Sequence, residues 1–474
     1  MKNLWSLLLL LAAVPGQAQT AADSALVGRI LVAEDRRDST DADLAAGLRH
    51  RDPRIQRIAR RALGRIRDPR FAARDSLPPA AAAPAWPEPA WRLRYRALAG
   101  RGADCGALRA ALEDSVWHVR LRAMDLAEAP CGADSALVGA LVRWVDALRP
   151  DTERRAAGGV SWHGGAHALV ALARIAPGQA RERVRNLAGY PGWHVRLYAV
   201  RAAAVLADTS VLRSAAQDRD GNVQEAAIDA LAKLVGHGAD DLYLAALQGE
   251  APQAVRAAAV ALKGSSAPGV REAANQHFER WVRFASESER DVRVALLELA
   301  GRPVSDDRPP APRFDLPPDA VALALGREAR IRVTLLPESG GGSFVVRLRG
   351  DVAPIMAARV LELVREGYYD GGNWHRVEAD FVIQGGGPGR NEYEGHAHSL
   401  RDELGTVAHP RGTIGMSTRG HDTGDAQWFI NLRDNARLVR DYTVFAEVVE
   451  GMDVVDGILE GDVVETMQVE TDEP

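Results

Sequence analysis

The chain has 474 residues, of which 46% are hydrophobic and 26% are charged, with a formal net charge of −5. This length exceeds what one hydrophobic core usually organises, so we expect two or more domains. The net charge is mildly acidic, so the composition gives no reason to expect a nucleic-acid-binding surface.

The first 18 residues have the pattern of a secretory signal peptide. Lys2 precedes an apolar run from Leu7 to Val14, and small residues end the segment at Ala18. The run is too short to span a bilayer, and no cysteine follows the cleavage site, which disfavours a lipoprotein. We expect cleavage after Ala18 and an exported protein, periplasmic or extracellular, with no membrane insertion after cleavage. An uncleaved anchor is the alternative.

Residues 19–301 have helical periodicity broken by short Gly, Pro and Asp turns. WHVRLRA at 117–123 recurs as WHVRLYA at 193–199, and a turn followed by Val-Arg recurs at intervals of roughly 30 residues. This pattern resembles HEAT repeats, which implies an all-α solenoid of stacked helical hairpins, because one hairpin cannot bury its apolar face alone. We expect the repeat arginines to bond turn carboxylates such as Asp114 or Asp291; a ligand-binding arginine ladder is the alternative.

Cys105 and Cys131 are the only cysteines, which excludes a disulfide-dense scaffold. Export permits a bond between them, and their similar turn-like settings could place them face to face on neighbouring repeats. Two buried free thiols fit the sequence equally well.

Six prolines in residues 302–320 predict a semi-rigid extended linker. From 321 to 474 the pattern changes. The runs ARIRVTL and SFVVRLRG predict a β-hairpin, residues 353–367 an amphipathic helix, and FVIQ, TIGMS, WFINL and TVFAEVV further strands.

Two segments of this last region carry the most information: NWHRVEADFVIQGGG at 373–387 and GMSTRGHDTGDAQWFIN at 415–431. They resemble, in order and in spacing, the two signature segments of the cyclophilin family of peptidyl-prolyl cis-trans isomerases. The resemblance covers about residues 328–460 and implies a closed β-barrel with flanking helices, without cofactor or metal. A metal at His396 and His398 is disfavoured, because no third ligand has suitable spacing.

The resemblance also implies a set of site residues. Arg376 and Gln384 match the family's catalytic residues. The family's substrate-binding positions correspond in this chain to Phe381, Val382, Thr418, Gln427, Phe429, Leu438 and Tyr442. Independently of the family, alternation along a strand places Val382 and Gln384 on one face, and a buried strand rarely carries glutamine, so we expect Gln384 to face a cavity. The chain departs from the family at Val382, Ser417, Arg419 and Arg437.

The chemistry fits these residues. Amide resonance imposes a barrier of about 18–20 kcal/mol on rotation of an X-Pro bond. A donor aimed at the prolyl nitrogen stabilises the twisted bond selectively, and a guanidinium is always charged. We therefore expect a peptidyl-prolyl isomerase for exported, proline-containing polypeptides, with the solenoid docking a protein partner. The alternative is a non-catalytic proline-peptide-binding or scaffold protein.

Overall fold

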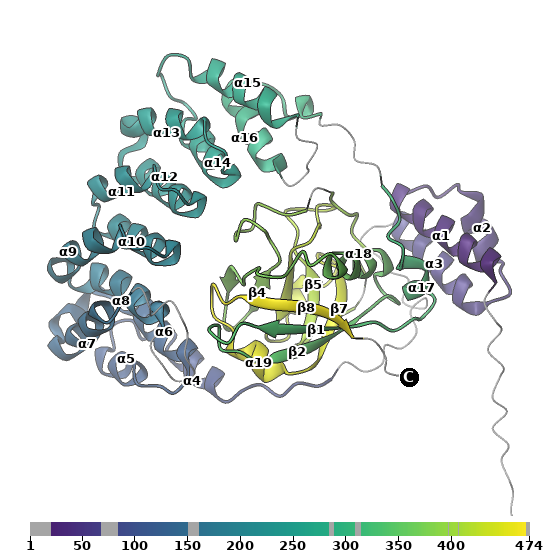
Figure 1. The fold of residues 1–474 in the computed structure, drawn as a ribbon, viewed down its shortest axis with the longest axis horizontal. Coiled ribbons are helices and arrows are strands. Elements are labelled where there is room, and N and C mark those ends of the chain that lie inside the picture. The colour runs from purple at the N-terminus through teal and green to yellow at the C-terminus, as the bar shows by residue number, and fades with distance from the viewer. Residues whose placement is uncertain are drawn as a thin grey trace, which may run out of the picture.

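The computed structural model describes residues 20–67, 84–149, 161–283, 289–308 and 314–470, without 397 and 406. Helices occupy the chain as far as residue 300, and a sheet with three helices follows (Figure 1). The predicted signal peptide falls outside the described residues. Within the described part, no helix is both long enough and apolar enough to cross a bilayer.

The helices before the sheet are short, and most end at the turns that the sequence marks. Several begin at an aspartate or serine whose side chain accepts from backbone N–H groups of the first turn, as Asp134, Ser161, Asp208 and Asp220 do. The α-helices are α1 Ala21–Arg36, α2 Ala42–Leu48, α3 Pro53–Arg67, α4 Trp91–Ala97, α5 Cys105–Ala111, α6 Trp117–Leu126, α7 Ser135–Asp146, α8 Trp162–Ile175, α9 Pro177–Leu187, α10 Trp193–Val205, α11 Thr209–Ala215, α12 Gly221–Val235, α13 Asp240–Leu247, α14 Pro252–Ala261, α15 Val270–Trp281 and α16 Arg290–Ala300.

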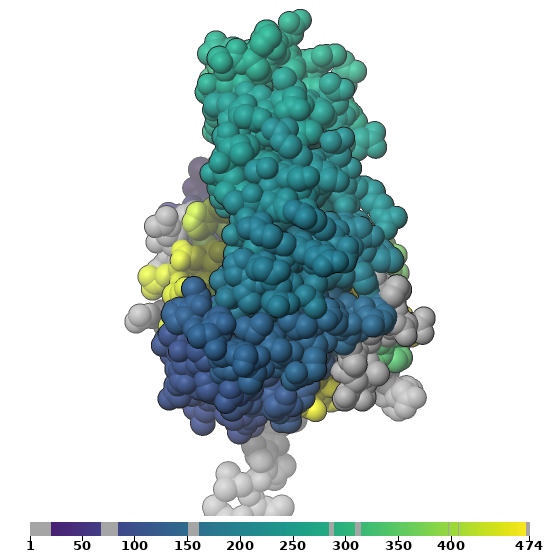
Figure 2. Space-filling view, turned by 90° about the vertical axis from the view of Figure 1, so that its left-hand side faces the viewer, coloured from purple at the N-terminus to yellow at the C-terminus, as the bar shows by residue number. Residues whose placement is uncertain are grey.

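Helices α4 to α16 form an arch. Each inner helix packs on the next one along the series α6, α8, α10, α12, α14 and α16, and one apolar core runs through them. Cys105 at the start of α5 is bonded to Cys131, so the structure selects the disulfide from the two possibilities. The arch curves around the sheet (Figure 1), and its outer face is a continuous surface with the sheet domain visible at its edges (Figure 2).

Helices α1 to α3 form a separate N-terminal triplet. Val27, Ile30 and Ile55 are fully buried, and they share their core with the sheet domain rather than with the arch. Where the sequence predicted one helical run over 19–301, the structure distributes the helices between two cores. Arg65 strengthens this attachment: it is fully buried and donates to the backbone carbonyls of Leu404, at 2.7 Å, and Val352, at 2.8 Å.

The repeat arginines partly follow the prediction. Arg196 donates to both carboxylate oxygens of Asp218 at 2.8 Å, across a turn. The two carboxylates named from the sequence have other partners. Asp114 pairs with an arginine of α4, and Asp291 pairs with Arg419 of the sheet domain at 2.8 Å. Asp291 therefore joins the arch to the sheet domain, which the repeat pattern could not indicate.

The sheet has eight antiparallel strands in the order β3-β4-β6-β5-β7-β2-β1-β8. The strands are β1 Arg330–Leu335, β2 Ser343–Leu348, β3 Arg376–Val377, β4 Val382–Gly385, β5 Thr413–Met416, β6 Trp428–Asn431, β7 Val444–Glu450 and β8 Val464–Glu470. The predicted hairpin is β1–β2, and the predicted helix is α18 Pro354–Arg365. Helices α17 Ala320–Ala324 and α19 Met452–Gly457 complete the sheet domain.

The sheet is curled, and backbone bonds tie its two ends together. Asn373, just before β3, bridges to Val463, just before β8, and the N–H of Trp374 donates to the carbonyl of Asp462 at 2.9 Å. Of the predicted linker, residues 304–306 form a short 3₁₀ turn and residue 320 begins α17, whereas 309–313 lie outside the described residues.

Candidate active site

Three adjacent strands bring the main predicted side chains together. Arg376 on β3 lies opposite Gln384 on β4, and Gln384 lies opposite Phe429 on β6. Residues far apart in the sequence thereby become neighbours, because cross-strand partners have side chains on the same face of a sheet. The sequence could predict the strands, whereas the register is a property of the fold.

A cavity of about 160 Å³ opens at this point of the sheet. Its lining includes every site residue predicted from the sequence: Arg376, Phe381, Val382, Gln384, Thr418, Gln427, Phe429, Leu438 and Tyr442. It also includes residues that were not predicted to act: Glu392, Ser417, Arg419, Thr423 and Asp425. The expectation that Gln384 faces a cavity agrees with this lining.

One wall of the cavity is apolar. Val382, Phe429 and Leu438 are buried against one another, with Phe381 and Tyr442 packed around them. The rings of Phe429 and Tyr442 meet edge to face, with centroids 5.4 Å apart. This cluster is distinct from the main core of the sheet domain. Apolar side chains assembled beside a cavity can hold a small apolar ring out of water.

The opposite wall is a chain of side-chain amides. Gln384 donates from Nε2 to the Ser417 hydroxyl at 2.9 Å and to Gln427 Oε1 at 3.2 Å. Gln427 in turn donates to the backbone carbonyls of Asn391 and Glu394, at 3.1 and 2.6 Å. These bonds fix the orientation of both glutamines. The sequence marked Ser417 only as a departure from the family; its hydroxyl has a defined partner in the site.

Arg376 stands at the rim of the cavity, with 43% of its side chain exposed. Its Nη1 donates to Gln384 Oε1 at a long 3.5 Å, and its nearest carboxylate, that of Glu378, is 3.9 Å away and largely exposed. Neither contact saturates a guanidinium that has five N–H donors. The side chain therefore keeps donors for a ligand.

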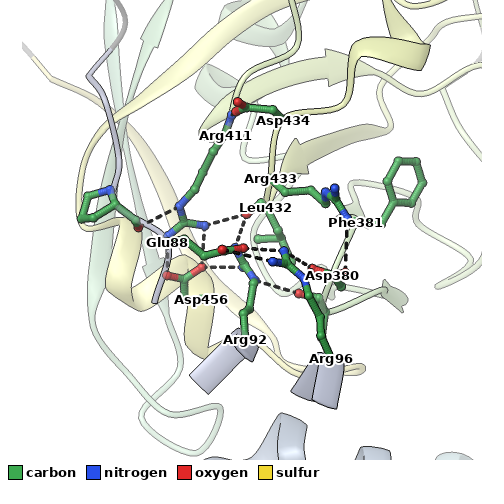
Figure 3. Close-up of polar contacts among 12 residues, drawn as sticks. Glu88, Arg92, Arg96, Asp380, Phe381, Arg411, Leu432, Arg433, Asp434 and Asp456 are labelled. Atoms are coloured by element: carbon green, nitrogen blue, oxygen red, sulfur yellow. Dashed lines mark hydrogen bonds and ion pairs between the residues drawn. The ribbon is translucent and has the colours of Figure 1, made fainter. Parts of the chain in front are cut away.

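Helix α4 holds the turn that precedes the pocket wall. From α4, Arg92 donates to the carbonyl of Ala379 at 3.1 Å, and Arg96 donates to Asp380 at 2.8 Å (Figure 3). Phe381, the next residue along the chain, belongs to the pocket. The guanidinium of Arg437, one of the departures from the family pattern, lies over the Phe381 ring, 4.1 Å from its centroid.

The arch also reaches the opposite rim. Arg419 lines the cavity and is fixed by two partners: Asp291 on α16, at 2.8 Å, and the backbone carbonyl of Glu392, at 2.5 Å. Asn222 on α12 bonds the neighbouring Asn391 at 3.1 Å. The helical region therefore contacts the loops on both sides of the cavity, which nothing in the two sequence motifs foreshadows.

Comparison with known proteins identifies the family of the C-terminal residues. Residues 333–473 match the family model described as cyclophilin type peptidyl-prolyl cis-trans isomerase/CLD. A peptidyl-prolyl cis-trans isomerase of Helicobacter pylori is 36% identical over 130 residues, which are 27% of this chain and 80% of the relative. Peptidyl-prolyl cis-trans isomerase B of Escherichia coli is 38% identical over 128 residues, 25% of this chain and 78% of the relative. The chain therefore belongs to the cyclophilin family, and its C-terminal domain is a cyclophilin-type peptidyl-prolyl cis-trans isomerase.

Proposed function

We propose that the protein accelerates rotation about X-Pro bonds in exported polypeptides and so assists their folding, with Arg376 and Gln384 as its catalytic residues. The observation that carries this assignment is the lining of one cavity, where an incompletely paired guanidinium and two oriented amides face an apolar cluster. No covalent step and no cofactor are required, because the reaction only changes a dihedral angle.

The mechanism follows from which interactions strengthen as the bond twists. The pyrrolidine ring lies against Phe381, Val382 and Phe429, so the ring is held while the peptide on its other side turns. Loss of amide resonance makes the prolyl nitrogen a better acceptor, and Arg376 donates to it. That bond is stronger in the transition state than in either ground state, which is the condition for lowering the barrier.

The amides and the remaining wall residues hold the substrate chain. Gln384 positions the guanidinium of Arg376 and, with Gln427, offers polar atoms to peptide groups of the substrate. To Thr418 we assign backbone hydrogen bonds to the substrate, and to Leu438 and Tyr442 the continuation of the apolar wall; all three line the cavity. Fixing the substrate chain on both sides of the rotating X-Pro bond in this way converts binding energy into orientation.

Export is supported by two independent features. Residues 1–18 have the signal-peptide pattern, with cleavage after Ala18. The Cys105–Cys131 disulfide suits an oxidising compartment such as the periplasm or the extracellular space. The arch, which we take to be a HEAT-like solenoid, would dock a client protein next to the active site and raise its local concentration.

The test is a protease-coupled isomerisation assay on a short X-Pro peptide with purified residues 19–474. The variant Arg376→Ala should lower kcat/KM by about 10²-fold, as does removal of a donor that acts on the transition state. Arg332→Ala is the matched control, because the side chain of Arg332 on β1 is 44% exposed and also pairs with a glutamate. If neither the wild type nor the variants accelerate rotation although the peptide binds, the protein is instead a proline-peptide-binding scaffold.

A further inference from the structure

A second cavity, of about 420 Å³, lies between the arch and the sheet domain. Helices α10 and α12 supply one wall, and residues around β3 and the 390–393 loop supply the other. Arg376 and Glu392 line both this groove and the active-site cavity. The two spaces therefore share the side chain that the proposed mechanism assigns to the proline.

The walls of the groove are fixed relative to each other. Asn222 of α12 donates to the carbonyl of Gly389 at 3.3 Å and accepts from Asn391 at 3.1 Å. The guanidinium of Arg256 on α14 lies over the Tyr393 ring, 4.3 Å from its centroid. Because the arch is bonded to the loop beside the active site, both walls of the groove belong to one packed structure.

Three carboxylates lie where α12 of the arch faces the 390–393 loop. Glu225 and Asp229 on α12 and Glu392 on the rim loop all line the groove. Burial, with repulsion from Asp229 and Glu392, raises the pKa of Glu225 to about 7 although Arg256 pairs with it at 2.7 Å. Asp229 and Glu392 make no ion pair within the described ranges.

Three arginines also line the groove, together with a fourth acid, Glu460. Arg201 is held by Glu460, at 3.9 Å, and lies over the Tyr198 ring, 4.4 Å from its centroid. Arg390 lines the groove with an exposed side chain, and the proposed mechanism assigns Arg376 to the proline. A cationic side chain of a ligand would find two carboxylates without an ion-pair partner among the described residues, Asp229 on α12 and Glu392 on the opposite loop.

His375 adds an independent sign of an occupant. It lies beside Arg376 in the sequence and lines the groove, and both of its ring nitrogens are buried without a hydrogen-bond partner among the described residues. Burial lowers its pKa to about 4, so the ring is neutral and offers one donor and one acceptor. Buried polar atoms without partners are uncommon and costly, and peptide groups passing through the groove would pair with them.

We propose that the groove between α12 and the 390–393 loop is a second substrate subsite, which binds the extended polypeptide beside the target proline and prefers lysine or arginine there. This inference rests on the proposed isomerase function. It predicts that substrates are extended segments, since the chain must pass between two walls, and that part of the selectivity resides in α12, outside the cyclophilin domain.

The experiment compares a short X-Pro peptide with extended peptides that carry one lysine or one glutamate at each of several positions on either side of the proline. We expect kcat/KM for the lysine peptide to exceed that for the glutamate peptide by about five-fold on one side of the proline, the size of a partly shielded charge interaction. The difference should lie in KM and should shrink at high salt.

Asp229→Asn combined with Glu392→Gln should bring the lysine-to-glutamate ratio close to one. Glu465→Gln, which removes an exposed acid from β8, is the matched control and should keep the ratio. Acceleration of the short peptide by the wild type together with equal rates for the two extended peptides would overturn the subsite while leaving the isomerase intact. If the short peptide is not accelerated, the proposed function fails, and the ratio of the two extended peptides' binding constants, measured by fluorescence anisotropy, still decides the subsite.

Discussion

Arg92 provides the sharpest test of whether the helical region and the isomerase domain form one structural unit. It is fully buried on α4 and donates to Asp456 at 2.9 Å, to the carbonyl of Ala379 at 3.1 Å and to the carbonyl of Leu432 (Figure 3). Methionine fills a similar volume without the charge. We expect Arg92→Met to destabilise both parts of the protein together.

The magnitude follows from what the remaining groups retain. Arg411 donates to both carboxylate oxygens of Asp456, at 2.8 and 2.5 Å, and to the carbonyl of Leu432 at 2.8 Å. Asp456 and Leu432 thus keep a second donor when Arg92 is replaced, and only the Ala379 carbonyl is left without a side-chain donor among the described residues. Leaving such a group unpaired costs about 1–3 kcal/mol. The larger cost of about 3–5 kcal/mol, for leaving a buried charge without any partner, does not apply, because Arg411 still pairs with Asp456. We therefore expect a loss of about 2 kcal/mol.

The assay is urea unfolding of residues 19–474, followed by far-UV circular dichroism for the helices and by isomerase activity for the sheet domain. Arg94→Met is the control on the same helix, because Arg94 is 48% exposed and pairs with Asp114, and such pairs contribute no more than about 1 kcal/mol. Arg92→Met should lower both midpoints equally and raise KM, since the turn before Phe381 loosens. Two separate transitions, or a loss no larger than that of Arg94→Met, would refute the reasoning.

Three further predictions concern other parts of the molecule. Burial lowers the pKa of His409 to about 4. Because the folded pKa lies below the ordinary value of 6.5, the unfolded protein binds a proton at this residue more readily than the folded protein between pH 6.5 and 4. The free energy of unfolding should therefore fall as the pH drops through this window, by up to about 1.4 kcal/mol per pH unit. The free energy of unfolding of His409→Gln should depend less steeply on pH across this window than that of the wild type, and equal slopes would contradict the lowered pKa. A Cβ at Gly415 would lie 2.4 Å from Phe429 Cζ. Gly415→Ala should therefore displace Phe429 in the apolar wall of the cavity, cost about 1–3 kcal/mol of stability and lower kcat/KM. Unchanged kinetics would argue against a role of Phe429 in the pocket. The disulfide Cys105–Cys131 spans a sequence separation of 26, so replacing both cysteines by serine should lower the unfolding free energy by about 3–4 kcal/mol, and a reductant should affect only the wild type.

The sequence by itself determined the elements and most of the pocket. Helical and alternating periodicities separate the two regions because each reflects which side chains of a helix or strand are buried, a local property. The pocket residues follow from two segments in which Arg376, Gln384, Gln427 and Phe429 have fixed places on strands. Once those strands pair, alternation alone places their side chains around one cavity.

The tertiary structure decided how the helical region relates to the site. Arg65 and Leu404 are 339 residues apart in the sequence and bonded in the fold, and Asp291 reaches Arg419 across two domains. Such contacts depend on isolated polar residues that have no periodicity, and an exposed arginine is indistinguishable from an interfacial one until its partner is placed. The choice between bonded and free cysteines was open for the same reason. Periodic burial is encoded locally along the chain, whereas a contact between two particular side chains exists only when the whole chain has folded.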